Sequence, residues 1–298
     1  MADYQEYRRR VLNKRWRRVV LTISSLVLVL LLLAINLLWR NLQRDNRQAA
    51  AVSILAQEIP GTEWKSAQYV AARSLTVQKT DDGQTALDFR MAALPETPPV
   101  DVSYFTQASF LGDSLTQGMQ IYDTGLPNAN FCAYKGVGPN AVVNGTSCKR
   151  TDGVEEVPME ALTDQQPKVL YVLLGTNVLG RDGDYANFLT YYRLMLDMIH
   201  QQLPDTIIYV QSITPVRPEV CAEERHAGLN RERLCRSNDE LAAVALEKNC
   251  YFLNLWEALA DENGDLKEEY AQPDGYHLKP EGYTAWVEYL STHTVSAA

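Results

Sequence analysis

Cysteine pairs of the zinc-binding kind are missing from this sequence, and histidine is scarce. Its 298 residues include five cysteines and four histidines, and no two cysteines form a Cys-x-x-Cys pair. The cysteine spacings therefore fit no zinc signature. No internal repeat is visible, and the length suits one large domain or two small ones.

Basic residues are sparse after position 47. The whole chain has 28 Lys and Arg against 37 Asp and Glu; residues 1–47 hold ten basic and three acidic residues, which leaves 18 basic and 34 acidic residues for the remainder. A part so acidic repels phosphate backbones. We therefore expect no nucleic acid as a partner.

One long apolar run stands near the amino terminus. Residues 19–38 contain no charged side chain, and twenty helical residues span about 30 Å, the thickness of a bilayer core. Seven Lys and Arg precede the run and only Arg40, Arg44 and Arg47 follow it closely. The positive-inside rule predicts a cytoplasmic tail at 1–18, a membrane anchor at 19–39 and an extracellular remainder. A cleaved signal peptide is the alternative, but its apolar region would be shorter.

Residues 40–100 are predicted to be a stalk and linker. Their first part favours a helix to about Gln57, and Pro60-Gly61 ends it. The proline-rich 94–99 stretch is typical of a stiff extended linker. The main globular domain is then expected at 101–298.

Short apolar runs alternate with helical stretches after the linker. The runs cover 107–111, about 130–137, 169–174, 206–210 and 251–255, and amphipathic stretches at 185–202 and 230–248 lie between the later ones. This alternation predicts an α/β fold with a parallel five-stranded sheet covered on both faces. Ligand sites of such sheets lie beyond the strands' carboxyl ends, where Ser114, Gly138 and Asn177 fall.

Ser114 follows the first of these runs directly. A buried strand that ends in Gly112 and Asp113 would deliver this serine to a helix amino terminus, where free N–H groups favour negative charge. The serine is a candidate nucleophile if a base lies within reach. Alternatively, Ser114 or Asp113 is only a helix cap.

His277 is the best-placed partner for this serine. It stands at the expected start of a helix with Asp274 three residues before it, so that the two side chains would be neighbours on a helical turn. Asp274 can then accept from one ring nitrogen while the other faces Ser114. Alternatively, Asp274 is a cap and His277 a surface residue. His200, His226 and His293 are placed at a helix end, in a charged loop and in the tail.

The cysteines allow two local disulfides. Outside the cell, Cys132 with Cys148 and Cys221 with Cys235 would each close a short loop. Five reduced cysteines are the alternative. Cys250 is predicted to be a buried thiol, because it lies in an apolar run.

Residues 103–290 resemble the SGNH/GDSL hydrolase family. Three blocks carry the resemblance, Gly112-Asp113-Ser114-Leu115, Gly175-Thr176-Asn177 and Asp274-Gly275-Tyr276-His277. The resemblance implies a flavodoxin-like α/β/α sandwich and ester hydrolysis through an acyl-serine, with no metal or cofactor. It also implies site roles: Ser114 is the nucleophile, His277 the base and Asp274 its orienting partner. The oxyanion would be bound by N–H groups of Ser114 and a glycine and by the Asn177 amide.

The chain departs from the family pattern at two positions. The block that often reads Asn-x-Gly is here Tyr134-Lys135-Gly136-Val137-Gly138, so the oxyanion glycine is Gly138, or alternatively Gly136. Val178 follows Asn177 where many members have an aspartate.

These features predict a membrane-anchored, extracellular serine esterase that removes small acyl groups, chiefly from carbohydrate. Its partners would be an acylated carbohydrate or another small ester, and the membrane through the amino-terminal helix. A carbohydrate O-acyltransferase with the same triad and a catalytically inactive binding domain are the alternatives.

Overall fold

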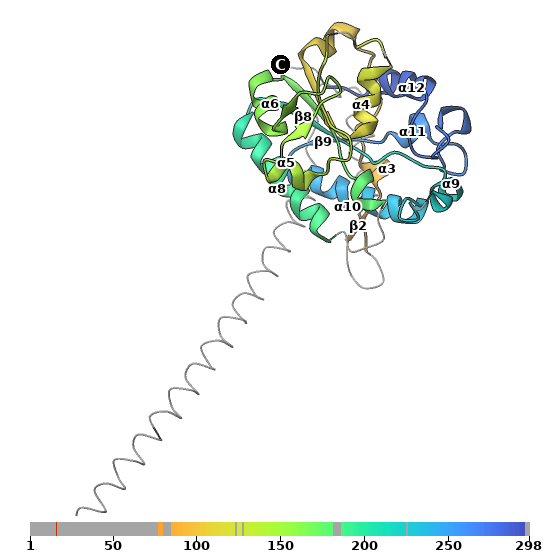
Figure 1. The fold of residues 1–298 in the computed structure, drawn as a ribbon. Helices are drawn as coiled ribbons and strands as arrows, with labels where there is room; N and C mark the ends of the chain where they lie inside the picture. Colours follow the sequence, from red (N-terminus) through yellow and green to blue (C-terminus); the bar gives the residue numbers. More distant parts are fainter. Residues whose placement is uncertain are drawn as a thin grey trace, which may run out of the picture. The chain divides into compact units, whose positions relative to one another are not determined.

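A five-stranded parallel sheet forms the centre of the domain (Figure 1). The computed structural model describes Trp16 and residues 77–79, 85–122, 124–126, 128–180, 186–224 and 226–295. The strands run in the order β4-β3-β7-β8-β9. Since β3 is the first of these strands along the chain, the order is that of flavodoxin-like sheets. The strands are β3 (Ala108–Gly112), β4 (Asn130–Ala133), β7 (Val169–Leu173), β8 (Ile207–Gln211) and β9 (Tyr251–Leu253). The predicted five-stranded parallel sheet is confirmed.

The inner strands are buried along their whole length. Every residue of β3 and β7 is buried, which explains their unbroken apolar sequence. On one face, each strand contributes an aromatic ring to a row that crosses the sheet in register. Neighbouring ring centroids in this row are 4.8–5.5 Å apart, a spacing at which aromatic pairs attract. The row is Phe131, Phe110, Tyr171, Tyr209 and Tyr251.

Helices pack on both faces of the sheet, which gives three layers. One face carries α5 (Pro139–Val143), α6 (Pro158–Gln165), α8 (Ala186–Gln202) and α10 (Arg231–Glu247), and the other carries α4 (Ser114–Ile121), α11 (Trp256–Leu259) and α12 (Pro280–Ser291) (Figure 1). Tyr192, Leu196 and Ile199 of α8 are buried, as the helical spacing predicted. Asn230 and Lys248 cap α10 at its two ends.

Smaller elements complete the described part. They are β1 (Val77–Lys79), β2 (Thr85–Leu87), α3 (Phe89–Ala92), η1 (Val102–Gln107), β5 (Cys148–Lys149), β6 (Glu155–Glu156), α7 (Thr176–Leu179), α9 (Pro218–Glu223) and η2 (Glu268–Tyr270). β1 pairs with β2 and β5 with β6, both antiparallel. Neither hairpin was expected, because each strand has only two or three residues.

The expected linker before residue 101 is part of the domain. The Phe89 ring is buried against Phe252 and Trp256, and the Leu94 N–H donates to the Phe252 carbonyl at 2.8 Å. Thr97 N–H donates to the Thr292 carbonyl at 2.6 Å. The 94–99 stretch is extended, but the domain boundary at 101 was wrong because apolar side chains and backbone hydrogen bonds hold residues 88–100 on the domain.

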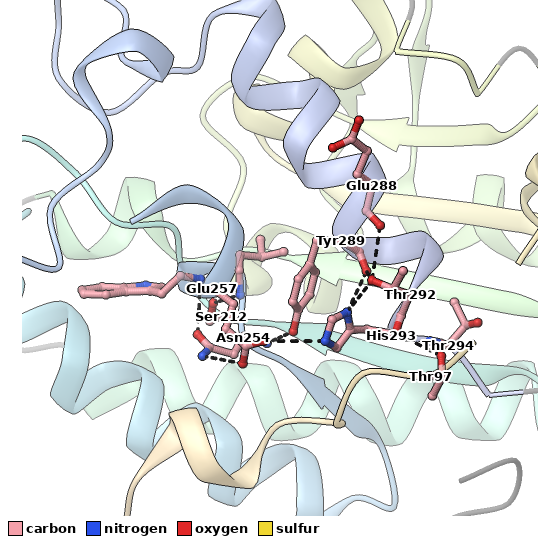
Figure 2. Close-up of polar contacts among 11 residues, drawn as sticks. Thr97, Ser212, Asn254, Glu257, Glu288, Tyr289, Thr292, His293 and Thr294 are labelled. Carbon is pink, nitrogen blue, oxygen red and sulfur yellow. Dashed lines mark hydrogen bonds and ion pairs between the residues drawn. The ribbon is translucent and has the colours of Figure 1, made fainter. Parts of the chain in front are cut away.

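His293 belongs to the core, although the sequence placed it in the tail. Its ring stacks on Tyr289 with centroids 3.8 Å apart, and its Nε2 lies 3.6 Å from a Glu257 carboxylate oxygen. Figure 2 shows these side chains together, with Thr97 beside Thr294. The segment around Thr97 therefore pairs with the end of the described chain after α12.

The five cysteines are all free thiols. The Cys132 thiol donates to Gln165 and the Cys148 thiol to the Thr146 carbonyl. Cys221 is buried in α9, whereas Cys235 lies half-buried on α10. The predicted disulfides Cys132–Cys148 and Cys221–Cys235 are wrong. In each pair the two cysteines lie on different elements, so their short separation in sequence does not bring the thiols together. The prediction that Cys250 is buried is confirmed.

No helix in the described residues is long and apolar enough to cross a bilayer. The predicted anchor at 19–39, and most of the predicted tail and stalk, lie outside the described residues.

Gly112 joins β3 to α4 where no side chain fits. A Cβ at this position would overlap the Thr116 side chain and lie 2.9 Å from the Leu173 carbonyl oxygen. We expect Gly112→Ala to lower the free energy of unfolding by about 3 kcal/mol, near the upper end of usual overpacking costs. Urea unfolding of the purified chain measures this change. An unchanged midpoint would show that the junction can relax.

Candidate active site

Ser114 lies at the switch point of the sheet, where the chain leaves β3 and enters α4. Asp113 is the helix cap, since its carboxylate accepts from the Leu115 N–H at 3.0 Å. The cap and nucleophile interpretations are therefore compatible: the cap is Asp113, and the Ser114 hydroxyl is free for another partner. That partner is Nε2 of His277, 2.8 Å from the Ser114 Oγ.

Asp274 completes a continuous hydrogen-bonded relay. Its Oδ2 lies 2.7 Å from Nδ1 of His277, and its Oδ1 accepts from the backbone N–H groups of Tyr276 and His277 at 3.2 and 3.0 Å. Burial, the largest single influence, raises the pKa of Asp274, but the hydrogen bonds from His277 and Tyr276 together lower that pKa below its ordinary value. The carboxylate is thus ionised and oriented to hold the imidazole.

The segment that carries Asp274 and His277 is a turn, so the predicted helical turn was wrong. Gly275 has a φ of +81°, and α12 begins only at Pro280. The turn still brings the i and i+3 side chains together because the Asp274 side chain closes it onto the backbone. Residues 274–277 are called the catalytic turn below.

Packing fixes the catalytic turn from two sides. The Arg217 N–H donates to the Gly275 carbonyl at 2.7 Å, and a Cβ at Gly275 would lie 2.8 Å from the Val220 side chain. The Tyr276 ring packs against the His277 ring with centroids 4.3 Å apart. No sequence pattern points to Arg217 and Val220 as supports of this turn, since both lie in a remote segment at the start of α9 (Pro218–Glu223).

Gly138 and Asn177 lie at the neighbouring strand ends. Gly138 is buried and caps α5, and a Cβ on it would lie 3.2 Å from Val178. Val178, the departure from the family pattern, therefore packs against Gly138. Gly136 is exposed, in a turn with a φ of +78°, and a Cβ there would meet no atom within 4 Å.

Asn177 contacts Asp113. Its amide nitrogen lies 2.9 Å from Asp113 Oδ2 and 3.3 Å from the Val137 carbonyl oxygen. Asp113 was considered only as a cap in the sequence, and its contact with Asn177 joins residues 64 positions apart. His226 also lies nearby, with its ring 5.3 Å from that of Tyr276.

A serine hydrogen-bonded to a histidine–carboxylate pair at this sheet edge defines a serine hydrolase site. The family model of the GDSL-like Lipase/Acylhydrolase family matches residues 110–285, more than half of the chain. The chain belongs to this family and is a carboxylic ester hydrolase.

Solved structures that are similar to this chain match it at low sequence identity. A GDSL-like lipase from Bacteroides thetaiotaomicron is 16% identical over 64% of this chain and 88% of its own, with a TM-score of 0.48. The lipase/acylhydrolase from Enterococcus faecalis is 14% identical over 62% and 92%, with a TM-score of 0.44. An acetyl esterase solved with an acetate ion is 14% identical over 60% and 92%, with a TM-score of 0.41. The comparison with curated proteins found no match.

Proposed function

We propose that the Ser114 hydroxyl attacks the ester carbonyl and that His277, oriented by Asp274, activates this hydroxyl. The observation that carries this assignment is the unbroken relay from Ser114 Oγ through the imidazole to Asp274. His277 takes the hydroxyl proton as the C–O bond forms, then returns it to the leaving alcohol as the acyl–serine ester remains. Water attacks this ester in the second half, with His277 again as base, and the acid leaves.

The oxyanion is assigned to the N–H groups of Ser114 and Gly138 and to the Asn177 amide. Gly138 is preferred to Gly136 because it is buried and lies against the residue after Asn177. The Ser114 N–H is at the start of α4, where helical backbone donors have no partner in the helix. Donors fixed in this way favour charge that develops only in the transition state.

Asn177→Ala should lower kcat by about 10²–10³-fold, because the variant loses one oxyanion donor. KM should change little, since the donor acts mainly on the transition state. Steady-state kinetics with p-nitrophenyl acetate measures both constants. An equal rise in KM with unchanged kcat would instead assign Asn177 to ground-state binding.

The proposed substrate is a small acyl ester, chiefly an acetyl group on carbohydrate. Family membership and the predicted extracellular position support this proposal. Purified full-length protein should release acid from acetylated glycans and from acetyl esters faster than from decanoyl esters. A preference for decanoyl esters would replace the carbohydrate assignment with a lipid one.

A carbohydrate O-acyltransferase would use the same relay with a sugar hydroxyl in place of water. Adding a sugar acceptor to the acetyl-ester assay separates the two activities: hydrolysis yields free acetate, and transfer yields an acetylated sugar. The inactive-domain alternative predicts neither product.

The proposed location is the outer face of the cell membrane, with the amino terminus in the cytoplasm. Its support is the basic flank before residues 19–38. A membrane-impermeant amine reagent on intact cells should label domain lysines such as the exposed Lys135. Labelling only after lysis would place the domain inside.

A further inference from the structure

The Asp113 carboxylate is fully buried and both of its oxygens accept a hydrogen bond. Oδ1 accepts from the Leu115 N–H at 3.0 Å, and Oδ2 accepts from the Asn177 amide at 2.9 Å. An ionised carboxylate offers only acceptors. The ionised Asp113 carboxylate can therefore pair with the two N–H donors beside it, but not with another acceptor.

This match selects one orientation of the Asn177 amide. An amide side chain has a donor end and an acceptor end, and an acceptor-only partner can pair only with the donor end. The nitrogen is accordingly turned to Asp113, and its other contact is with the Val137 carbonyl at 3.3 Å. That second contact is longer than a typical N–H···O bond of about 2.9–3.0 Å. A charged oxyanion is a stronger acceptor and can replace it.

We infer that Asp113 is a positioning residue for the oxyanion hole, whose carboxylate holds the Asn177 amide with its N–H groups toward the reacting carbonyl. The inference rests on the proposed role of Asn177. It gives Asp113 a second function beside capping α4: one oxygen fixes the helix that carries Ser114, and the other fixes an oxyanion donor on α7, which follows the neighbouring strand β7.

The surroundings of Asp113 make this positioning sensitive to pH. Burial raises the pKa of Asp113 to about 7, against the opposing effect of the Leu115 and Asn177 hydrogen bonds. The titratable groups that face it are Tyr192 of α8, Tyr276 of the catalytic turn and Tyr283 of α12, with His277 next along the relay through Ser114. As pH falls through about 7, Asp113 gains an O–H donor and no longer selects the nitrogen end of the amide.

The first test is a double-mutant cycle with Asp113→Asn and Asn177→Ala in the full chain. Asparagine keeps the size and an acceptor for Leu115 but also carries donors, so it does not select the amide orientation. Asp113→Asn should lower kcat on p-nitrophenyl acetate by about 10²-fold, as the loss of one oxyanion donor does, with little change in KM. Asp113→Asn added to Asn177→Ala should cause almost no further loss.

Asp239→Asn is the matched control. Asp239 is a half-buried carboxylate that accepts from the Phe89 N–H at 2.9 Å, and partial burial raises its pKa to about 6. It lies at the α3–α10 contact, so its replacement should leave kcat unchanged. If Asp113→Asn keeps normal kcat, or if the two losses multiply in the double variant, the inference is wrong.

A second measurement needs no Asp113 variant and covers the case in which that variant does not fold. Below pH 7, log kcat/KM of the parent should fall more steeply than that of Asn177→Ala, because only the parent uses the amide that the Asp113 carboxylate orients. The Asn177→Ala variant has no amide to orient, so protonation of Asp113 should add nothing to its pH dependence. Equal slopes would overturn the inference. Should Asn177→Ala itself be fully active, the oxyanion assignment fails rather than the Asp113 link.

Discussion

Ser114→Ala should reduce kcat for ester hydrolysis by about 10⁶-fold, the loss typical when the nucleophile of such a relay is removed. Without Oγ no acyl-enzyme can form, and only water with the remaining oxyanion donors is left. The fold should survive because α4 is capped by Asp113 and the Ser114 hydroxyl bonds only to His277 in the described structure. Burst kinetics with p-nitrophenyl acetate measures the acylation step directly.

A labelled fluorophosphonate supplies the covalent check. It should label Ser114 in the parent chain and leave Ser114→Ala unlabelled. Peptide mapping of the labelled protein identifies the modified serine. Ser103→Ala, in η1 before β3 and so at the opposite edge of the sheet, should be labelled like the parent. Labelling of a different serine, or substantial esterase activity in Ser114→Ala, would reject the relay.

The sheet was predictable because its strands are buried on both faces. Uninterrupted apolar runs such as 169–173 are typical of strands in a parallel sheet covered on both faces, and five such runs correspond to the five strands. The helices α8 and α10 were predictable for a similar reason, since each has a continuous apolar face. Apolar patterns of this kind show which side chains are buried, and burial of apolar surface is the dominant favourable term in the free energy of folding.

Features that depend on contacts between remote segments were not predictable. Residues 88–100 have linker-like composition, but their N–H groups bind remote acceptors, among them the carbonyls of Phe252, Ser291 and Thr292. The catalytic turn has the spacing of a helix, but the positive φ of Gly275 and its contact with Val220 produce a turn. The predicted conformation of this segment was therefore wrong, but the predicted contact between Asp274 and His277 is present.

The site divides in the same way. Ser114, His277 and Asp274 could be proposed from residue chemistry and spacing, and the structure brings the three side chains together. The link from Asp113 to Asn177 could not be proposed, because no local pattern shows which side chain a buried carboxylate at the end of one strand meets beyond the end of another. The aspartate beside the serine was a signal, but a capping role already accounted for it.

His277→Ala should be nearly as inactive as Ser114→Ala, because the serine hydroxyl is a weak nucleophile without its base. The double variant should be no slower than either single one, since nucleophile and base act as a unit. Single and double variants are compared by kcat on p-nitrophenyl acetate, after circular dichroism confirms that each is folded.

His226→Ala is the local control for that comparison. His226 packs edge-on against Tyr276, which itself covers His277, but the Ser114 hydroxyl is bonded to His277. The control should therefore keep most of the parent activity. Loss of activity in His226→Ala together with its retention in His277→Ala would move the base to His226. If the losses of the two single variants multiply in the Ser114 and His277 double variant, the two residues act independently. The proposal that they act as one catalytic unit would then be wrong.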